Sequence, residues 1–411
     1  MIAAVAGVSS KARPGAFLTR CVVCGGAGAT PIWAVEKTPI HPFRPPAAAG
    51  TSAGFGRLDV VQCDTCGHLY NAAFDPSGAE DLYGAFVLTN VPVSPSMVKA
   101  VEGTAESILR HAKLKPSVLE VGGGGGGLSV LLAQRGCEVD LVEPSRALSA
   151  DRFAGTGVRF HQSMFPTPAL AGRMFDVAIC RQVLEHIPEP EPFLKALRAQ
   201  IRDDGVAYIE LPSAEYIYST RSIVDFHYPH VHFYLRPHLE ALFVRAGFAI
   251  SDTIDVKDGH DTAFILRPVA PGKGTIPSAT DSAPFVQALV VRRAHGRERI
   301  AEVKGSIALY GANAYSQALL GVYPSFTNFD AMFDDTPMYD GQKAYGPSHD
   351  ITIGPPSADK LAKVDAVIVT AYLHDLVISR KVRQLGFKGP IYTVRSDKLA
   401  GQGDVPPSLF G

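Results

Sequence analysis

The stretch SVLEVGGGGGGL, residues 117–128, decides the fold of the central part of this chain. Val118, Leu119 and Val121 make its first part apolar, which predicts a buried strand. The glycines at 122–127 then permit a sharp turn and let a ligand approach the backbone closely. A helical pattern follows at 128–135, so the order strand, glycine turn and helix predicts a ligand-binding turn.

The sequence around this turn alternates strand-like and helical stretches. Apolar runs at 138–144, 175–180 and 205–212 predict further strands, and helical patterns occupy 96–113 and 192–201. Strands separated by helices of this length indicate parallel crossovers. We therefore predict an α/β fold with a doubly wound, Rossmann-like sheet whose ligands bind at the carboxyl ends of the strands.

The glycine turn could serve either of two nucleoside cofactors. A dinucleotide would use the spacing G-x-G-x-x-G and place its pyrophosphate at the helix N-terminus. The spacing E-x-G-x-G-x-G from Glu120 to Gly126 instead resembles motif I of class I methyltransferases, which bind S-adenosylmethionine (SAM). Glu143, which ends the next strand, can accept hydrogen bonds from ribose hydroxyls in either case. A plain flexible turn with a solvated glutamate is the third interpretation.

The segment RQVLEHIPEP, residues 181–190, favours the SAM interpretation. It follows a predicted strand and resembles the VLEHI-PxP segment of small-molecule methyltransferases, and the strand at 205–212 is similar to the next strand of those proteins. Residues 95–265 therefore resemble a whole class I SAM-dependent methyltransferase domain. The resemblance implies cofactor contacts from Glu120, Gly122, Gly124, Gly126, Glu143 and Gln182.

Four of the six cysteines form two C-x-x-C pairs, Cys21 with Cys24 and Cys63 with Cys66, and each pair is followed by glycine. Two such knuckles present four thiolates that can close a tetrahedral Zn²⁺ site, and a complete thiolate shell makes the metal structural. Redox-active pairs and plain buried cysteines are the alternatives. His68, close to the last cysteine, is predicted to be a turn residue.

Length and composition indicate several packed domains. The chain has 411 residues, of which 46% are hydrophobic and 19% are charged. We predict a zinc-binding domain at 1–85, a SAM-dependent methyltransferase domain at 86–270 and a second Rossmann-like α/β domain at 285–411. A loose stretch at 268–284, rich in proline and small residues, predicts the linker.

Charge and hydropathy argue against two classes of partner. Lys plus Arg (39) nearly equals Asp plus Glu (40), so no bulk positive field attracts nucleic acid or an anionic membrane. No apolar run approaches the roughly 20 residues that span a bilayer. The first residues also lack the pattern of a signal peptide. We expect a cytoplasmic protein with neither nucleic-acid nor membrane partners.

The order of the three predicted domains resembles the sugar C-methyltransferase family, which acts on nucleotide-linked keto-sugars. The segment GHLYNAAFDPSG, residues 67–78, resembles that family's junction between zinc knuckle and catalytic domain. Segments at 305–320, 332–342 and 365–375 are similar to its C-terminal domain. The resemblance covers nearly all of the chain and implies C-methylation of a nucleotide-linked keto-sugar. The C-terminal domain would either hold the nucleotide or act as a scaffold.

In that family a base is thought to remove a proton next to a ketone, and the enolate then attacks the SAM methyl group. Histidine suits this role because its pKa lies near working pH. The stretch HYPHVHFY, residues 227–234, is similar to the family's Y-x-E-H segment. His230 falls on the family's histidine, and His186 falls on another position near the reacting centre. The resemblance therefore implies His230, His186 and His227 as catalytic residues.

Departures from the family pattern keep other functions open. Pro229 stands where the family has glutamate, and the family's H-G-G-S segment reads GHDT at 259–262, so the pocket is altered. O- or N-methylation of another small-molecule or sugar acceptor is the first alternative. A non-catalytic nucleoside-binding module is the second. His227, His230 and His232 could also bind a metal, or be ordinary core or surface histidines.

Overall fold

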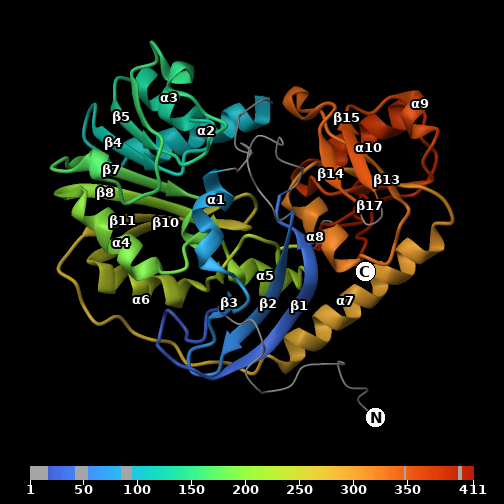
Figure 1. Cartoon of the computed structure of the whole chain (residues 1–411), viewed down its shortest axis with the longest axis horizontal. Helices are drawn as coiled ribbons and strands as arrows, with labels where there is room; N and C mark the ends of the chain where they lie inside the picture. The colour runs from blue at the N-terminus through green and yellow to red at the C-terminus, as the bar shows by residue number, and fades with distance from the viewer. Residues whose placement is uncertain (1–16, 42–53, 85–94, 347–348, 397–399) are drawn as a thin grey trace.

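The computed structural model describes residues 17–41, 54–84, 95–346, 349–396 and 400–411. These residues form three β-sheets with helices packed around them (Figure 1). In Figure 1 the central sheet lies on the left, the C-terminal sheet lies on the right, and the small N-terminal sheet lies below and between them. No helix in this described part of the chain is both long enough and apolar enough to cross a membrane.

The central sheet has the strand order β10-β11-β8-β7-β4-β5-β6. Strands β4 to β8 pair in parallel, whereas β11 and β10 extend the sheet in the antiparallel sense. The chain order reverses at β4, and such a switch point opens a crevice at the carboxyl ends of the strands. The strands are β4 (Ser117–Val121), β5 (Glu138–Val142), β6 (Val158–His161), β7 (Phe175–Arg181), β8 (Ile201–Pro212), β10 (Phe248–Val256) and β11 (Asp261–Pro268).

The sequence predicted four of these strands, and all four are confirmed, as is the α/β class. It missed β6, which has only four residues, two of them charged or titratable, and the β10–β11 hairpin, whose first strand is mostly half-exposed. The helix predicted at 192–201 ends too late, because Ile201 begins β8. The helices of this part are α2 (Pro95–Leu109), α3 (Gly127–Gln134), α4 (Pro190–Ala199), α5 (Ala214–Thr220) and α6 (Arg236–Ala246).

The N-terminal sheet is antiparallel and has the order β1-β2-β3-β9. Its strands are β1 (Ala29–Pro39), β2 (Phe55–Cys63), β3 (Leu69–Asn71) and β9 (His232–Phe233), and the short helix α1 spans Ala79–Gly84. The last strand comes from a distant part of the sequence, since β9 follows β8 and α5 of the central unit. The segment just before β9 is therefore anchored by backbone pairing to the N-terminal sheet.

The C-terminal sheet has the order β14-β15-β13-β12-β16-β17, and β13, β12, β16 and β17 run parallel. Helix α7 (Ala283–Glu302) leads into it after an irregular stretch that follows β11. Its strands are β12 (Ile307–Tyr310), β13 (Phe329–Phe333), β14 (Lys343–Tyr345), β15 (Asp350–Gly354), β16 (Ala366–Val369) and β17 (Ile391–Thr393), and its other helices are α8 (Ala314–Val322), α9 (Ala358–Leu361) and α10 (Asp375–Gln384).

The N-terminal sheet contributes to the hydrophobic cores of both larger units. Trp33 and Val60 belong to a buried cluster that continues into the C-terminal sheet through Leu309. Val61 belongs to a second cluster that continues into the central sheet through Leu119. Because packed apolar cores are dense and resist displacement, this shared packing fixes how the carboxyl ends of the two larger sheets face each other.

Candidate functional site

The glycine turn joins β4 to α3 at the switch point of the central sheet. Gly122, Gly124 and Gly126 have φ values of +69°, +53° and +75°, a conformation that other residues rarely adopt. A Cβ on Gly122 would lie 2.4 Å from Val183, so the turn passes close to the loop after β7. Gly122 and Gly124 line a cavity, whereas Gly126 caps the start of α3.

Glu143 follows β5 and is held by the backbone on both sides. Its two carboxylate oxygens accept hydrogen bonds from the amides of Gly124 (2.9 Å) and Ser145 (3.0 Å). Burial raises the pKa of Glu143, and the two amide bonds oppose this effect. The residue also lines the cavity, so the structure places an oriented carboxyl group beside the glycine turn, where a ribose could be bound.

Glu120 and Gln182, the other two predicted cofactor residues, have different surroundings. Glu120 is 2% exposed, accepts a 2.5 Å hydrogen bond from the Ser129 hydroxyl and is absent from the described cavity wall. Burial raises its pKa. Because Glu120 lies in β4 and Ser129 lies in α3, this hydrogen bond stabilises the glycine turn between them. Gln182 does line the cavity, and its amide donates to Asp261 (2.9 Å).

The cavity has a volume of about 550 Å³, which is in the range of small-molecule sites. It extends from the glycine turn, past the loop 227–230, to the carboxyl ends of β12 and β16 in the C-terminal sheet. Both larger units therefore contribute to this site, and the N-terminal part adds Ile40, which follows β1, and Tyr83 of α1.

His186, His227 and His230 come together on one wall of this cavity. The ring centres of His186 and His230 lie 4.8 Å apart, and those of His227 and His230 lie 4.0 Å apart. Burial lowers the pKa of His186 and of His227 to about 4, and it lowers the pKa of His230 well below the ordinary value. All three imidazoles are therefore neutral at pH 7, which is the form that can accept a proton.

The loop that carries His227 and His230 is held by all three units. The amide of Val231 donates to the Glu185 carbonyl of the central unit (2.9 Å), and the Asn71 amide of β3 donates to the Val231 carbonyl (2.8 Å). From the C-terminal unit, the Gln317 side chain donates to the Tyr228 carbonyl (2.8 Å). The arrangement of this wall thus depends on the whole fold.

His68 and His232 do not join the other histidines, which corrects two of the interpretations made from the sequence. His68 is 0% exposed, so it is a core residue rather than a turn residue. Its Nε2 lies 3.1 Å from Nδ1 of His232, and Nε2 of His232 donates to the Pro188 carbonyl (3.2 Å). Among the described residues, His227, His230 and His232 do not gather as potential metal ligands.

A buried polar network, which the sequence interpretation missed, closes the cavity on the side of the C-terminal sheet. The two ring nitrogens of His260 face Asp225 (2.8 Å) and Asp261 (2.5 Å), and the Tyr315 hydroxyl donates to Asp225 (2.6 Å). Although burial opposes it, the two carboxylates raise the pKa of His260 to about 9, so this imidazole is charged. The departure of GHDT from H-G-G-S was the only signal in the sequence.

Glu185, next to His186, is a second residue that the sequence interpretation did not single out. A carboxylate oxygen of Glu185 and one ring nitrogen each of His186 and His230 all lie within 4.8 Å of one another. The VLEH motif had drawn attention to His186 alone. A sequence pattern cannot show that the preceding glutamate points inward, because neighbouring residues in a turn face different sides.

The C-terminal sheet carries a turn that parallels the one in the central sheet. Gly311, with φ +117°, follows β12, and Asn313 caps α8 by accepting hydrogen bonds from two amides of its first turn. Asp334, at the end of β13, accepts hydrogen bonds from the amides of Ala312 and Thr336, each 2.8 Å long. Asp334 thus repeats the pattern of Glu143, with one bond to the neighbouring turn and one to the residue two positions ahead.

The four cysteines of the C-x-x-C pairs gather at the end of the N-terminal sheet. The Sγ atoms of Cys21 and Cys66 lie 3.6 Å apart, and those of Cys24 and Cys63 lie 3.4 Å apart. Tetrahedral Zn²⁺ with bonds of about 2.3 Å requires similar sulfur separations. The hydrogen bond from Cys66 lowers the pKa of Cys21 to about 5, which favours a thiolate. These residues therefore fit a Zn²⁺ ion.

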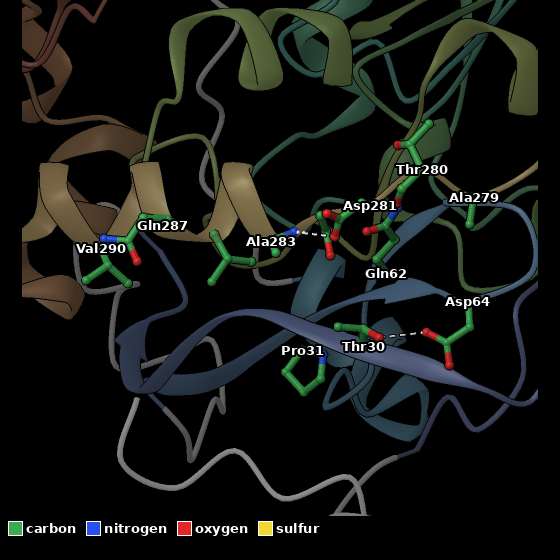
Figure 2. Close-up of a pocket in the computed structure, with 12 residues that line it drawn as sticks. Thr30, Pro31, Gln62, Asp64, Ala279, Thr280, Asp281, Ala283, Gln287 and Val290 are labelled. Atoms are coloured by element: carbon green, nitrogen blue, oxygen red, sulfur yellow. Dashed lines mark hydrogen bonds between the residues drawn. The ribbon is translucent and has the colours of Figure 1, made fainter. Parts of the chain in front are cut away.

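A second cavity of about 430 Å³ lies between the N-terminal sheet and the start of α7 (Figure 2). Its polar groups already bind one another: the Thr30 hydroxyl donates to Asp64 (2.7 Å), and Gln62 donates to the Thr280 carbonyl (3.0 Å). The bond from Gln62 attaches the segment before α7 to β2, and the Ala279 amide adds a bond to the Thr65 carbonyl (3.1 Å). The cavity thus marks where the connection between the two larger units crosses the N-terminal sheet.

Replacing Gly122 with alanine is expected to weaken binding of S-adenosylhomocysteine (SAH) at least tenfold, because the new methyl group would collide with Val183 and the backbone would be strained. Calorimetric titration of SAH measures this effect. Gly155→Ala is the matched control, since Gly155 has a similar φ of +74° but nothing within 4 Å of its Cβ position. Equal losses of affinity in both variants would contradict a role for the turn in cofactor binding.

Comparison with known proteins supports the assignment of the central unit. Residues 99–253 match the family described as "Methyltransferase domain". Two ubiquinone biosynthesis O-methyltransferases are similar to this chain: that of Bordetella avium is 34% identical over 94 residues, and that of Pseudomonas fluorescens is 35% identical over 97 residues. These matches cover 21% and 22% of this chain, and only 39% and 42% of the two relatives.

Two solved structures show a similar arrangement over part of the chain. One is a 1,6-didemethyltoxoflavin N1-methyltransferase of Burkholderia thailandensis with bound SAH, which has 21% identity, a TM-score of 0.34, and coverage of 41% of this chain and 78% of the other. The second is a magnesium protoporphyrin IX methyltransferase of Synechocystis with bound SAM. It has 17% identity and a TM-score of 0.33, and the match covers 42% of this chain and 79% of that protein. The sequence match over residues 99–253 agrees with the cavity at the switch point and with the oriented Glu143 beside it. The central unit of this chain is therefore a class I SAM-dependent methyltransferase domain.

Proposed function

We propose that this protein transfers the methyl group of SAM to a carbon atom of a nucleotide-linked keto-sugar. The observation that carries the proposal is the single cavity that joins the glycine turn, the three histidines and the turn of the C-terminal sheet. A cofactor at one end and a nucleotide at the other would place the reacting part of the acceptor near the histidines in the middle.

The cofactor end is formed by Gly122, Gly124, Glu143 and Gln182. SAM supplies an activated methyl group when it is bound there. The Glu143 carboxyl group is oriented by two amides and can accept hydrogen bonds from ribose hydroxyls. Glu120 and Gly126 would act indirectly, by holding the turn and the first residues of α3 in place.

The nucleotide end is formed by the C-terminal sheet. Asp334 lies beside a glycine turn and is oriented by two amides in the same way as Glu143. The parallel supports a second site for a nucleoside, because acceptance of ribose hydroxyls by such a carboxylate is a general feature of Rossmann-like turns. The N-termini of α8 and α10 also face the cavity through Asn313 and His374, and helix N-termini favour phosphate groups.

The histidines would form the enolate. His230, with His227 and His186 beside it, lines the cavity in its neutral form and could remove the proton next to the ketone. Nδ1 of His186 donates to the Pro229 carbonyl (3.3 Å), which fixes the tautomer of this ring. Pro229 therefore orients a histidine through its backbone, although it lacks the carboxylate that glutamate would provide.

O-methylation of another small molecule is the alternative, and the names of the similar curated relatives favour it. The same histidines could then deprotonate a hydroxyl group. The two functions differ in the atom that loses its proton, and this difference can be measured.

The test uses the purified full-length protein with SAM and dTDP-4-keto-6-deoxyglucose. We expect formation of SAH and a product with a new carbon–methyl bond, observed by mass spectrometry and ¹³C-methyl NMR. In D₂O with SAH in place of SAM, deuterium is expected to enter the carbon next to the ketone. A product methylated on oxygen, without such exchange, would favour the alternative. Absence of SAH with every keto-sugar and phenolic acceptor would contradict methyltransferase activity.

A further inference from the structure

A buried carboxyl group lies beside the proposed catalytic histidines without a defined role. Glu185 is 1% exposed and lies in the same helical turn, Leu184–His186, as His186. Within the described part of the chain, neither of its carboxylate oxygens has a hydrogen-bond partner. Burial of an ionisable group without a partner is strongly unfavourable, so the position of this side chain requires an explanation.

The geometry directs this carboxylate toward two imidazoles. Oε1 of Glu185 lies 3.8 Å from Nε2 of His186. Because Nδ1 of His186 donates to the Pro229 carbonyl, its Nε2 is the nitrogen that carries the lone pair, and this nitrogen is the one near Glu185. A donor atom of His230 lies within 4.8 Å of both groups. A proton taken up by either imidazole would thus be close to a carboxylate.

We propose that Glu185 is the charge partner of His186 and His230, and that it stabilises the imidazolium formed when the acceptor loses a proton. The inference rests on the proposed function. In this step the C–H bond of the acceptor breaks and its electron pair remains on the acceptor as the enolate. The proton forms an N–H bond on the imidazole, and the new positive charge is paired with the Glu185 carboxylate. Glu185 lies behind the histidines, so it is a positioning residue rather than a catalytic one.

The ionisation of Glu185 then controls the rate. Burial raises its pKa to about 8, so the group holds a proton at neutral pH and becomes a carboxylate as the pH rises through about 8. Because the pKa of Glu185 is raised, its charged form is the main one only above about pH 8. Turnover is therefore expected to increase as the pH rises through about 8. Other charged or titratable groups surround it or its two histidines: Lys257, Asp261, Glu210, Cys180, Tyr83, Tyr234, His227 and His260.

The test compares Glu185→Gln, which keeps the shape and removes the charge, with Glu185→Asp, which keeps the charge. Glu189→Gln is the matched control, because Glu189 is exposed and caps α4 without a side-chain bond. In full-length protein labelled with ¹⁵N-histidine and bound to SAH, the ring resonances of His186 and His230 are expected to shift in one step near pH 8. We expect Glu185→Gln to abolish this step, and Glu189→Gln to retain it.

Turnover provides the second measurement. With the keto-sugar acceptor, Glu185→Gln is expected to lower kcat roughly 10- to 100-fold, to leave the KM for SAM unchanged and to remove the rise near pH 8, and Glu185→Asp should restore part of the rate. A Glu185→Gln enzyme that keeps both the ¹⁵N step and the wild-type kcat would overturn the inference. Wild-type turnover that depends on added divalent metal would also overturn it. If the wild type forms no SAH, the proposed function fails, and the ¹⁵N titration still decides the role of Glu185.

Discussion

Replacing His230 with alanine is expected to lower kcat by roughly 10²- to 10⁴-fold, which is the usual contribution of a positioned general base. His230 is 7% exposed, lines the cavity and has His186 and His227 as its immediate neighbours. The residues at the cofactor end do not depend on it, so the affinity for SAH should change less than threefold. Single-turnover rates measure the first effect, and calorimetric titration measures the second.

The pH dependence of turnover provides a second test of His230 as the base. Burial lowers the pKa of His230 and holds that of His186 and His227 at about 4, so the imidazoles stay neutral from pH 8 down to about pH 5. Activity lost by protonation of these rings should therefore appear only below about pH 5. His349→Ala, at a half-exposed site of the C-terminal unit, is the control. A His230→Ala rate close to that of the wild type would refute the base, and a matching loss of SAH binding would indicate a damaged fold.

The geometry of the glycine turn could be predicted well because it depends on local sequence. A run of glycines between a strand and a helix has few interpretations. Glu143 follows the next strand, at the carboxyl ends of the parallel strands, where ligands bind. Glu120 was assigned to the same group by its place in the motif. The structure instead buries it against Ser129, because successive residues of a strand face opposite sides of the sheet.

The acceptor end could be predicted only in part because it is built from segments that are distant in sequence. His260, Asp225 and Tyr315 meet across two units, and no spacing in the chain indicates this. The pairing of β9 with β3 likewise joins residues more than 160 positions apart. The histidine segment 227–234 was identified by resemblance. His230 lies before β9 and lines the cavity, whereas His232 begins β9 and contacts His68, and the sequence pattern does not show where this strand begins.

We propose that the four cysteines bind Zn²⁺, so replacing Cys63 with serine is expected to prevent zinc binding and to destabilise the protein by several kcal/mol, since the metal-binding free energy of such sites is largely folding free energy. We expect about one equivalent of Zn²⁺ per wild-type chain by metal analysis, as a closed site of four thiolates requires. Cys137→Ser is the matched control, because Cys137 is also buried and lies outside the cluster. That variant should retain its zinc and lose roughly 1 kcal/mol. Wild-type protein purified without chelator that contains no metal would refute the zinc site.

The loss of zinc is also expected to displace the histidine loop 227–230 at the cavity, because β3 follows the second cysteine pair directly and pairs with β9. The bond from His68 to His232, and that from His232 to the Pro188 carbonyl, connect the same strand to the loop after His186. Trp33, the single tryptophan, stacks on Phe226 next to the histidine loop and reports on this region without any acceptor. Its emission should shift to the red in Cys63→Ser and remain unchanged in Cys137→Ser. If a zinc-free variant kept the wild-type emission and turnover, the metal would not be needed to position the histidine loop. The contacts of β9 with the central unit would then be sufficient for this positioning.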